Sequence, residues 1–238
     1  MNDTHHRATG VAMAGSLALA AHAGPALGSV LPALRPPLGV RDRLADRTMV
    51  ALTFDDGPDP RGTPAILEVL RAHAVTATFF VCGEQVRAAP ALAEEIVAAG
   101  HEIAVHGDRH RNLLRVPPAA LARDLADAEA AIVAACARAP RLYRPPYGVL
   151  SGAALAIARR RGWQPLLWTR WGRDWRGAAT ASSVAAEVTR DLVGGEVLLL
   201  HDADRYSAPG SWRTTAAALP IAIERVRERG LAFGGVGR

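Results

Sequence analysis

The stretch Met49-Val-Ala-Leu-Thr-Phe-Asp-Asp-Gly-Pro58 combines an apolar run with two adjacent carboxylates and a Gly-Pro turn. The composition of the run predicts a buried strand. Side chains alternate between the faces of a strand, so Asp55 and Asp56 reach one site only if the turn bends the backbone as it leaves the sheet. The alternative is a strand followed by a solvated Asp-Gly turn. A bent backbone would let one carboxylate bind a metal while its neighbour transfers a proton.

A second apolar run, Glu102-Ile-Ala-Val105, leads into His106-Gly-Asp-Arg-His110. Two histidines at this spacing can reach one ion if the segment turns, although surface pairs of this kind are common. Together with Asp56 they form an Asp/His/His set that leaves one coordination position open for water. Such a set is typical of catalytic rather than structural divalent metal sites.

Three further polar clusters follow apolar runs. Arg144 and Tyr147 lie in Arg141-Leu-Tyr-Arg-Pro-Pro-Tyr-Gly148, Asp174 in Trp168-Thr-Arg-Trp-Gly-Arg-Asp-Trp175, and His201 at the end of Gly195-Glu-Val-Leu-Leu-Leu-His-Asp202. Each residue alone has an ordinary structural interpretation. Five polar clusters at five successive strand ends instead indicate one site, because barrel enzymes collect their catalytic groups at the carboxyl ends of the strands.

These five segments, in this order, resemble the motifs of the NodB-homology polysaccharide deacetylases, carbohydrate esterase family 4, over roughly residues 49 to 233. The resemblance implies that Asp55 is the general base and His201 the general acid. It also implies that Asp56, His106 and His110 bind a divalent metal, most often zinc. The supporting roles it implies are Arg144 holding Asp55, Asp174 supporting His201, the Tyr147 backbone N–H stabilising the oxyanion, and Pro146, Trp175 and Leu199 lining the substrate groove.

One residue departs from the family pattern. Many members carry Ser or Thr after the first metal histidine, whereas this chain has Gly107. The missing hydroxyl puts a supporting hydrogen bond in doubt, but it leaves the ligand set intact.

Apolar and amphipathic runs alternate along the rest of the chain. Strands are expected at 49–54, 77–81, 102–105, 141–143, 164–168, 196–200 and 231–233, and helices at 64–73, 89–99, 118–138, 151–161, 182–191 and 214–229. Ser151 and Ser182 stand where helix N-caps belong. This alternation is typical of a mostly parallel sheet with helices outside it. The resemblance specifies the α/β class further, as a distorted (β/α)7 barrel of the NodB-homology type.

Composition limits the remaining function classes. The 238 residues, 50% of them hydrophobic, suffice for one substantial core, and we expect a single catalytic domain at 49–238. The net charge is +5, and every basic residue is arginine. No basic stripe interleaved with aromatic residues is present, which disfavours nucleic-acid binding. The two cysteines, Cys82 and Cys136, are expected to be free thiols. Nothing in the sequence indicates an oligomeric state.

The N-terminal part of the chain has a separate character. Residues 1–34 form an apolar segment in which positions 8–34 carry no charge, and residues 35–48, with Pro36-Pro37, are expected to be a linker. The uncharged run is long enough to span a membrane, yet Val11–Ala20 followed by Ala21-His-Ala23 also fits a secretory signal. Pro25, His22 and the many small residues weaken the membrane-anchor interpretation, and a disordered leader is a third alternative. We favour export or membrane association over a cytosolic leader.

The sequence thus predicts a metal-dependent hydrolase that removes N- or O-acetyl groups from an envelope carbohydrate. An amidohydrolase of the same scaffold, acting on a lipid-linked amino sugar or a small cyclic amide, would keep the same metal ligands. A carbohydrate-binding module without activity would be expected to lack Asp55 or His201, and both are present.

Overall fold

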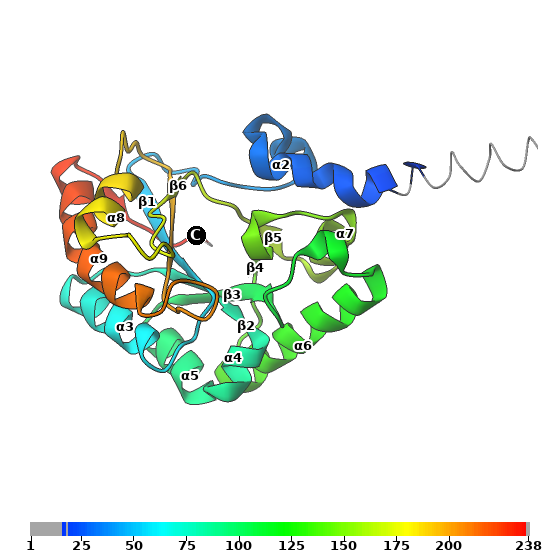
Figure 1. The fold of residues 1–238 in the computed structure, drawn as a ribbon, viewed down its shortest axis with the longest axis horizontal. Coiled ribbons are helices and arrows are strands. Elements are labelled where there is room, and N and C mark those ends of the chain that lie inside the picture. Colours follow the sequence, from blue (N-terminus) through cyan, green and yellow to red (C-terminus); the bar gives the residue numbers. More distant parts are fainter. Residues whose placement is uncertain (1–15, 18, 237–238) are drawn as a thin grey trace, which may run out of the picture.

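The computed structural model describes residues 16–17 and 19–236, and within them eight strands form a parallel sheet (Figure 1). The strands are β1 (Met49–Asp55), β2 (Thr78–Cys82), β3 (Glu102–Gly107), β4 (Leu142–Tyr143), β5 (Gln164–Pro165), β6 (Arg170–Trp171), β7 (Val197–His201) and β8 (Ala232–Phe233). The strand order is β5-β4-β3-β2-β1-β7-β6, and β8 pairs with β1 off this path. The expected distorted (β/α)7 barrel is confirmed, with β5 and β6 at its open edges.

Helices surround the sheet, as Figure 1 shows. They are α3 (Gly62–Ala72), α4 (Gly83–Ala88), α5 (Pro90–Ala98), α6 (Pro118–Cys136), α7 (Gly152–Arg161), α8 (Ala181–Val188) and α9 (Ser211–Glu228). The Ser151 hydroxyl accepts a hydrogen bond from Ala154 N and caps α7, as predicted. The predicted cap at Ser182 is wrong, because Thr180 begins α8 through a capping box with Ser183.

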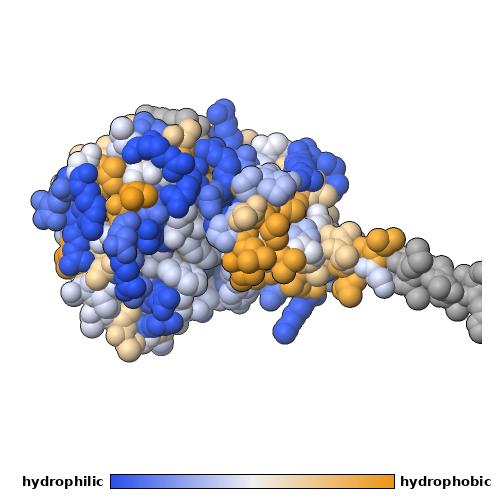
Figure 2. Space-filling view, turned by 90° about the horizontal axis from the view of Figure 1, so that it is seen from above, coloured by the Kyte–Doolittle hydropathy of each residue, from blue (hydrophilic) through white to orange (hydrophobic). Residues whose placement is uncertain are grey.

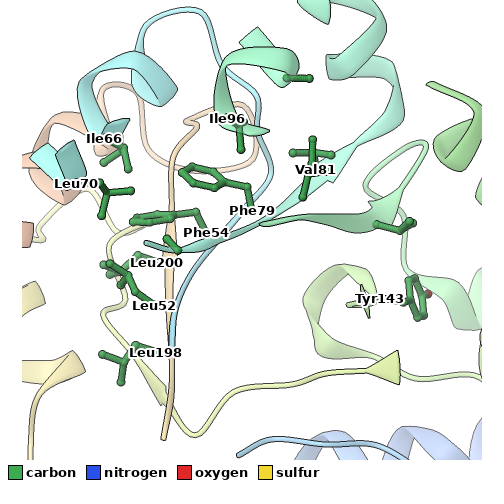
Figure 3. Close-up of a cluster of buried hydrophobic side chains, with 14 of the residues drawn as sticks. Leu52, Phe54, Ile66, Leu70, Phe79, Val81, Ile96, Tyr143, Leu198 and Leu200 are labelled. Atoms are coloured by element: carbon green, nitrogen blue, oxygen red, sulfur yellow. The ribbon is translucent and has the colours of Figure 1, made fainter. Parts of the chain in front are cut away.

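The core lies between the central strands and the helices that cover them. The rings of Phe54 on β1 and Phe79 on β2 stack with centroids 5.1 Å apart (Figure 3). Leu200 of β7 and Ile66 of α3 are also fully buried in this cluster. Because β1, β2 and β7 are buried and parallel, their carboxyl ends meet at one edge, and Asp55 is in register with His201. Both cysteines are free, as predicted: Cys82 is buried and Cys136 half-buried.

Residues 35–48, which we expected to form a linker, run along the open side of the barrel. Arg41 N donates to Pro165 O, and Leu167 N donates to Arg41 O, so this stretch pairs with the chain beyond β5. Leu44 N then donates to Gly195 O, just before β7. This stretch therefore connects the chain beyond β5, at one edge of the sheet, with the segment just before β7.

Arg35 anchors the N-terminal part of the chain to this stretch. This part consists of short turns, η1 (Gly24–Ala26), α2 (Leu27–Val30), η2 (Pro32–Leu34) and η3 (Pro36–Leu38), and Arg35 lies between the last two. The Arg35 side chain is 10% exposed and donates to Gly28 O at 3.0 Å, Asp42 Oδ2 at 2.7 Å and Trp168 O at 3.2 Å. One guanidinium group thus holds three separate segments together.

Replacing Arg35 by Ala is expected to lower the free energy of unfolding by about 1–3 kcal/mol, because several buried acceptors lose their donor at once. Urea unfolding followed by circular dichroism measures the loss. The matched control is Arg160→Ala, since Arg160 is exposed on α7. Superimposable unfolding curves for Arg35→Ala and the wild type would show that this contact network contributes nothing.

Candidate active site

Two adjacent carboxylates end β1, and the backbone turns sharply between them. Asp56 has a φ of +80°, a left-handed conformation that lets it and Asp55 face the same site, as the sequence required. Both residues are 3% exposed. A Cβ on Gly57 would lie 2.3 Å from Asp202 Oδ2, so the turn has room only for glycine. The interpretation as a solvated Asp-Gly turn is therefore wrong.

Arg144 fixes the first of these carboxylates. Its Nη1 donates to Asp55 Oδ1 at 2.7 Å and to Thr53 Oγ1 at 2.9 Å, and its Nε donates to Leu166 O at 3.1 Å. The guanidinium is fully buried and lies 4.0 Å from the centroid of the Phe80 ring. Such an arginine cannot swing away, so Asp55 keeps one orientation with its other oxygen, Oδ2, 3.8 Å from His106 Nε2.

The second carboxylate faces both histidines predicted as metal ligands. Asp56 Oδ1 lies 3.4 Å from Nε2 of His106 and 3.4 Å from Nε2 of His110, and the three ligand atoms all lie within 4.8 Å of one another. His106 belongs to β3, and the loop after it turns His110 back toward the same point. Two ligands held ~2.1 Å from a tetrahedral ion lie about 3.4 Å apart, so this set fits a divalent metal.

Hydrogen bonding and charge support the same conclusion. His106 Nδ1 lies 2.8 Å from Arg144 O, and since a carbonyl only accepts, Nδ1 carries the proton and Nε2 keeps its lone pair. Burial and the neighbouring His106 lower the pKa of His110 to about 4, so His110 is neutral near pH 7. Burial would raise the pKa of Asp56, but His106, His201 and His110 together lower it to about 2. Three electron-pair donors thus face one another, as a cation requires.

The glycine at position 107 suits the backbone conformation found there. Its φ of +111° lies in the region that favours glycine, and a Cβ there would lie 3.2 Å from Arg109 O. The backbone bends at this residue, directly before the loop that carries His110. A Ser or Thr here would be strained, so the backbone conformation found in this chain favours glycine.

His201, at the end of β7, is oriented by Asp174. Its Nδ1 lies 3.0 Å from Asp174 Oδ1, while Asp174 Oδ2 accepts hydrogen bonds from His201 N at 2.7 Å and from Thr215 Oγ1 at 2.8 Å. Burial alone would lower the pKa of His201, but Asp174, with Asp56 and Asp55, raises it to about 10. Because Nδ1 bonds the carboxylate, Nε2 is the nitrogen left for proton transfer.

These groups open into one cavity of about 270 Å³. Its polar lining comprises Asp55, Asp56, His106, His110, His201 and Ser207, and its other lining residues are Tyr147, Trp168, Trp171, Trp175, Leu199 and Tyr206. The Tyr206 ring stacks on His110 with centroids 4.3 Å apart, and its hydroxyl donates to Glu84 Oε1 at 2.8 Å. Flat aromatic faces beside polar groups suit the binding of sugar rings.

The structure brings together nearly all of the residues that the sequence placed in the site. Trp175 and Leu199 line the cavity, whereas Pro146 is buried in η5 (Pro146–Gly148), and Tyr147 is the residue that this turn contributes to the lining. The roles of individual residues remain predictions. The sequence did not single out Thr215 or Glu84, because ordinary helix residues gain such contacts only from the tertiary fold.

Comparison with known proteins agrees with this geometry. The family model for polysaccharide deacetylase matches residues 42–166. A chitooligosaccharide deacetylase of Bradyrhizobium sp. (strain ANU 289) is 37% identical, covering 76% of this chain and 85% of the relative. A peptidoglycan-N-acetylglucosamine deacetylase of Bacillus cereus is 33% identical, covering 78% and 84%.

A solved structure is similar as well. The family 4 carbohydrate esterase from Streptomyces lividans, in complex with acetate, superposes with a TM-score of 0.71 at 29% identity and covers 79% of this chain and 92% of that one. The sequence matches and the shared fold lead to one assignment: the chain belongs to the polysaccharide deacetylase family, hydrolases that act on carbon–nitrogen bonds other than peptide bonds.

Proposed function

We propose that this protein removes N-acetyl groups from an N-acetylglucosamine-containing oligosaccharide or polysaccharide of the cell envelope. The observation that carries the proposal is the meeting of three units around one cavity: the Asp55–Arg144 pair, the Asp56/His106/His110 set and the His201–Asp174 pair. Two relatives of the protein are named as a chitooligosaccharide deacetylase and a peptidoglycan-N-acetylglucosamine deacetylase, and both names support this substrate class.

The nucleophilic step depends on Asp55. Water is a poor nucleophile and an amide a poor electrophile, and a divalent ion bound by Asp56, His106 and His110 would supply Lewis acidity to both. Asp55 removes the proton of the attacking water. Arg144 holds Asp55 through Oδ1, which leaves Oδ2 facing the metal site for this task.

Breakdown of the tetrahedral intermediate depends on His201. The Tyr147 backbone N–H, by the family resemblance, donates to the negative oxygen that forms from the acetyl carbonyl, and one such donor is typically worth ~3 kcal/mol. The amine then leaves only when it is protonated. His201 Nε2 donates that proton, while Asp174 holds Nδ1 and stabilises the charged imidazolium.

We propose zinc as the bound ion, because two imidazole nitrogens, one carboxylate oxygen and an open position form a common catalytic zinc set. The purified protein is expected to bind about one divalent ion per chain, and chelation should abolish acetate release until metal is restored. Metal content by mass spectrometry and activity are measured together. Asp56→Ala should lose the metal, whereas Glu68→Ala on α3 is the control. Full activity after verified metal removal would refute metal dependence.

Acetate release is the test of the substrate class. It is measured on chitooligosaccharides, peptidoglycan fragments and acetylated xylan, with the free amine assayed in parallel. We expect equal amounts of acetate and amine from the first two substrates. Acetate without amine, from xylan alone, would show O-deacetylation instead. Activity only on a lipid-linked amino sugar or a small cyclic amide would favour the other amidohydrolase assignment.

We propose export to the cell envelope as the site of action. The uncharged run at 8–34 supports this, as does a relative named for peptidoglycan. Residues 1–15 lie outside the described part of the chain. Fractionation of cells that express the chain with a C-terminal tag tests the proposal, and recovery only in the cytoplasm would contradict it.

A further inference from the structure

Exposed apolar side chains gather on one segment of the protein. Figure 2 shows hydrophobic surface where the N-terminal segment meets the body of the molecule. Its large exposed side chains are Leu17 (67% exposed), Leu19 (67%), Leu27 (53%), Val30 (73%) and Leu31 (50%). Of the other large exposed hydrophobics, Tyr147, Trp171 and Tyr206 line the active-site cavity. A cluster of exposed apolar side chains on a protein surface marks an interaction site.

This segment is fixed to the body rather than detached from it. Ser29 Oγ donates to Gly148 O at 2.6 Å, and His22 Nε2 lies 3.3 Å from Leu114 O. The approach is close, because a Cβ on Gly152 would lie 2.1 Å from Ala21 O. Gly28 is buried against Leu38 and Leu150. The exposed side chains of Leu27, Val30 and Leu31 are therefore carried by a stretch that Gly28 and Ser29 hold against the body of the protein.

The N-terminal segment contributes no negative charge to this surface. No Asp or Glu occurs between Asp3 and Asp42. The elements that the segment packs against add cations: η4 (Leu113–Arg115) carries the exposed Arg115, and the last turn of α7 carries Arg159, Arg160 and Arg161. Arg161 is paired with Glu129 on α6, Arg159 is exposed but donates to Leu38 O at 3.1 Å, and Arg160 is exposed. An apolar surface bordered by arginines complements an anionic lipid surface.

We propose that the surface formed by Leu17, Leu19, Leu27, Val30 and Leu31, with the arginines beside it, docks onto an anionic lipid bilayer. The segment would lie in the interface and not cross it, because Pro25 and Pro32 divide it into short turns. Within the described residues, no helix is both long and apolar enough to span a membrane. A second copy of this chain is a poorer partner, since pairing two such surfaces would bring like charges together.

The position of this surface links it to the active site. Ser29 bonds the carbonyl of Gly148, and the neighbouring residue Tyr147 lines the cavity. A chain docked through Leu27, Val30 and Leu31 would therefore hold one wall of the cavity close to the lipid headgroups.

Vesicle sedimentation of the full-length protein tests the proposal. Vesicles of phosphatidylethanolamine and phosphatidylglycerol are compared with vesicles of phosphatidylcholine. The wild type is expected to bind the anionic vesicles more tightly, and Leu27→Ser/Val30→Ser/Leu31→Ser should lower this affinity by about tenfold or more, as should Leu17→Ser/Leu19→Ser, since binding scales with buried apolar area. Arg159→Gln/Arg160→Gln should weaken anionic binding alone.

The control is Val193→Ser/Ile221→Ser, which removes exposed apolar side chains elsewhere and should bind like the wild type. Unfolding curves and acetate release from a soluble substrate should be unchanged in the triple variant, which excludes misfolding. Equal vesicle binding by the wild type, the triple variant and Leu17→Ser/Leu19→Ser would overturn the proposal. So would a concentration-dependent dimer that the triple variant abolishes in the absence of vesicle binding.

Discussion

Replacing Asp55 by Asn is expected to lower turnover by ~10²-fold or more while the protein still binds its metal. The amide has nearly the same shape as the carboxylate, but it cannot take a proton from water. Asp55 Oδ1 faces Arg144, and Oδ2 is 3.8 Å from His106 Nε2, whereas Asp56 Oδ1 is the oxygen 3.4 Å from both histidines. The two carboxylates should therefore respond differently to the same substitution. Steady-state kinetics and metal content measured on one preparation separate them.

The control for this prediction is Asp127→Asn, which changes an exposed carboxylate on α6 and should leave both quantities unchanged. Asp56→Asn should reduce metal content as well as turnover. Loss of the metal from Asp55→Asn, with turnover recovering once metal is added back, would show that Asp55 is a ligand and that the two roles are assigned wrongly.

Much of the fold could be predicted because the local patterns agree with it. The apolar run of β1, the cap at Ser151 and the alternation of strands with helices are properties of short windows of sequence. Residues 35–48 were predicted to be a linker because Pro36-Pro37 and charged residues dominate their composition. Their hydrogen bonds to Pro165 and Gly195 are tertiary contacts that no local pattern specifies.

Most strand boundaries differ from the expected ranges by one or two residues, and the largest difference has the same cause. A single strand was expected at 164–168, but β5 ends at Pro165, Leu166 forms a bridge with Arg41, and the unexpected strand β6 follows at Arg170–Trp171. The expected helix at 89–99 begins as α5 at Pro90, and α4 precedes it. The start of a new helix at Pro90 could have been predicted, since proline favours the first turn of a helix.

The parts of the site that could be predicted are those whose residues lie close together in the sequence. The two members of each pair, Asp55–Asp56 and His106–His110, are close in sequence, so a local turn is enough to predict that they face the same site. Thr215 and Glu84 lie 41 and 122 residues from their partners Asp174 and Tyr206, and only the folded chain brings them together. Gly107 was a departure from a family pattern in the sequence, and in the structure it adopts a positive φ that favours glycine.

The second large effect concerns the proton donor. His201 must be protonated to donate to the leaving amine, so activity is expected below the pKa of His201 and should fall as pH rises through it. Burial has the largest effect and lowers this pKa. Asp174 is the main group that opposes burial, and the net result is a pKa of about 10. Removing an opposite charge at this distance typically shifts a pKa by 1–3 units. Asp174→Asn should therefore move the alkaline limb of the activity profile ~1–3 pH units lower.

The side-chain amide oxygen that Asp174→Asn introduces can still accept from His201 N or Thr215 Oγ1, so the backbone contact is kept while the charge is lost. Turnover is measured from pH 6 to pH 11 on one N-acetylated substrate, with Asp191→Asn as the control for loss of a surface carboxylate. His201→Gln should remove the alkaline limb altogether and reduce turnover most for substrates with poor leaving groups. An alkaline limb at the same pH in Asp174→Asn and the wild type would show that a different group supplies the proton.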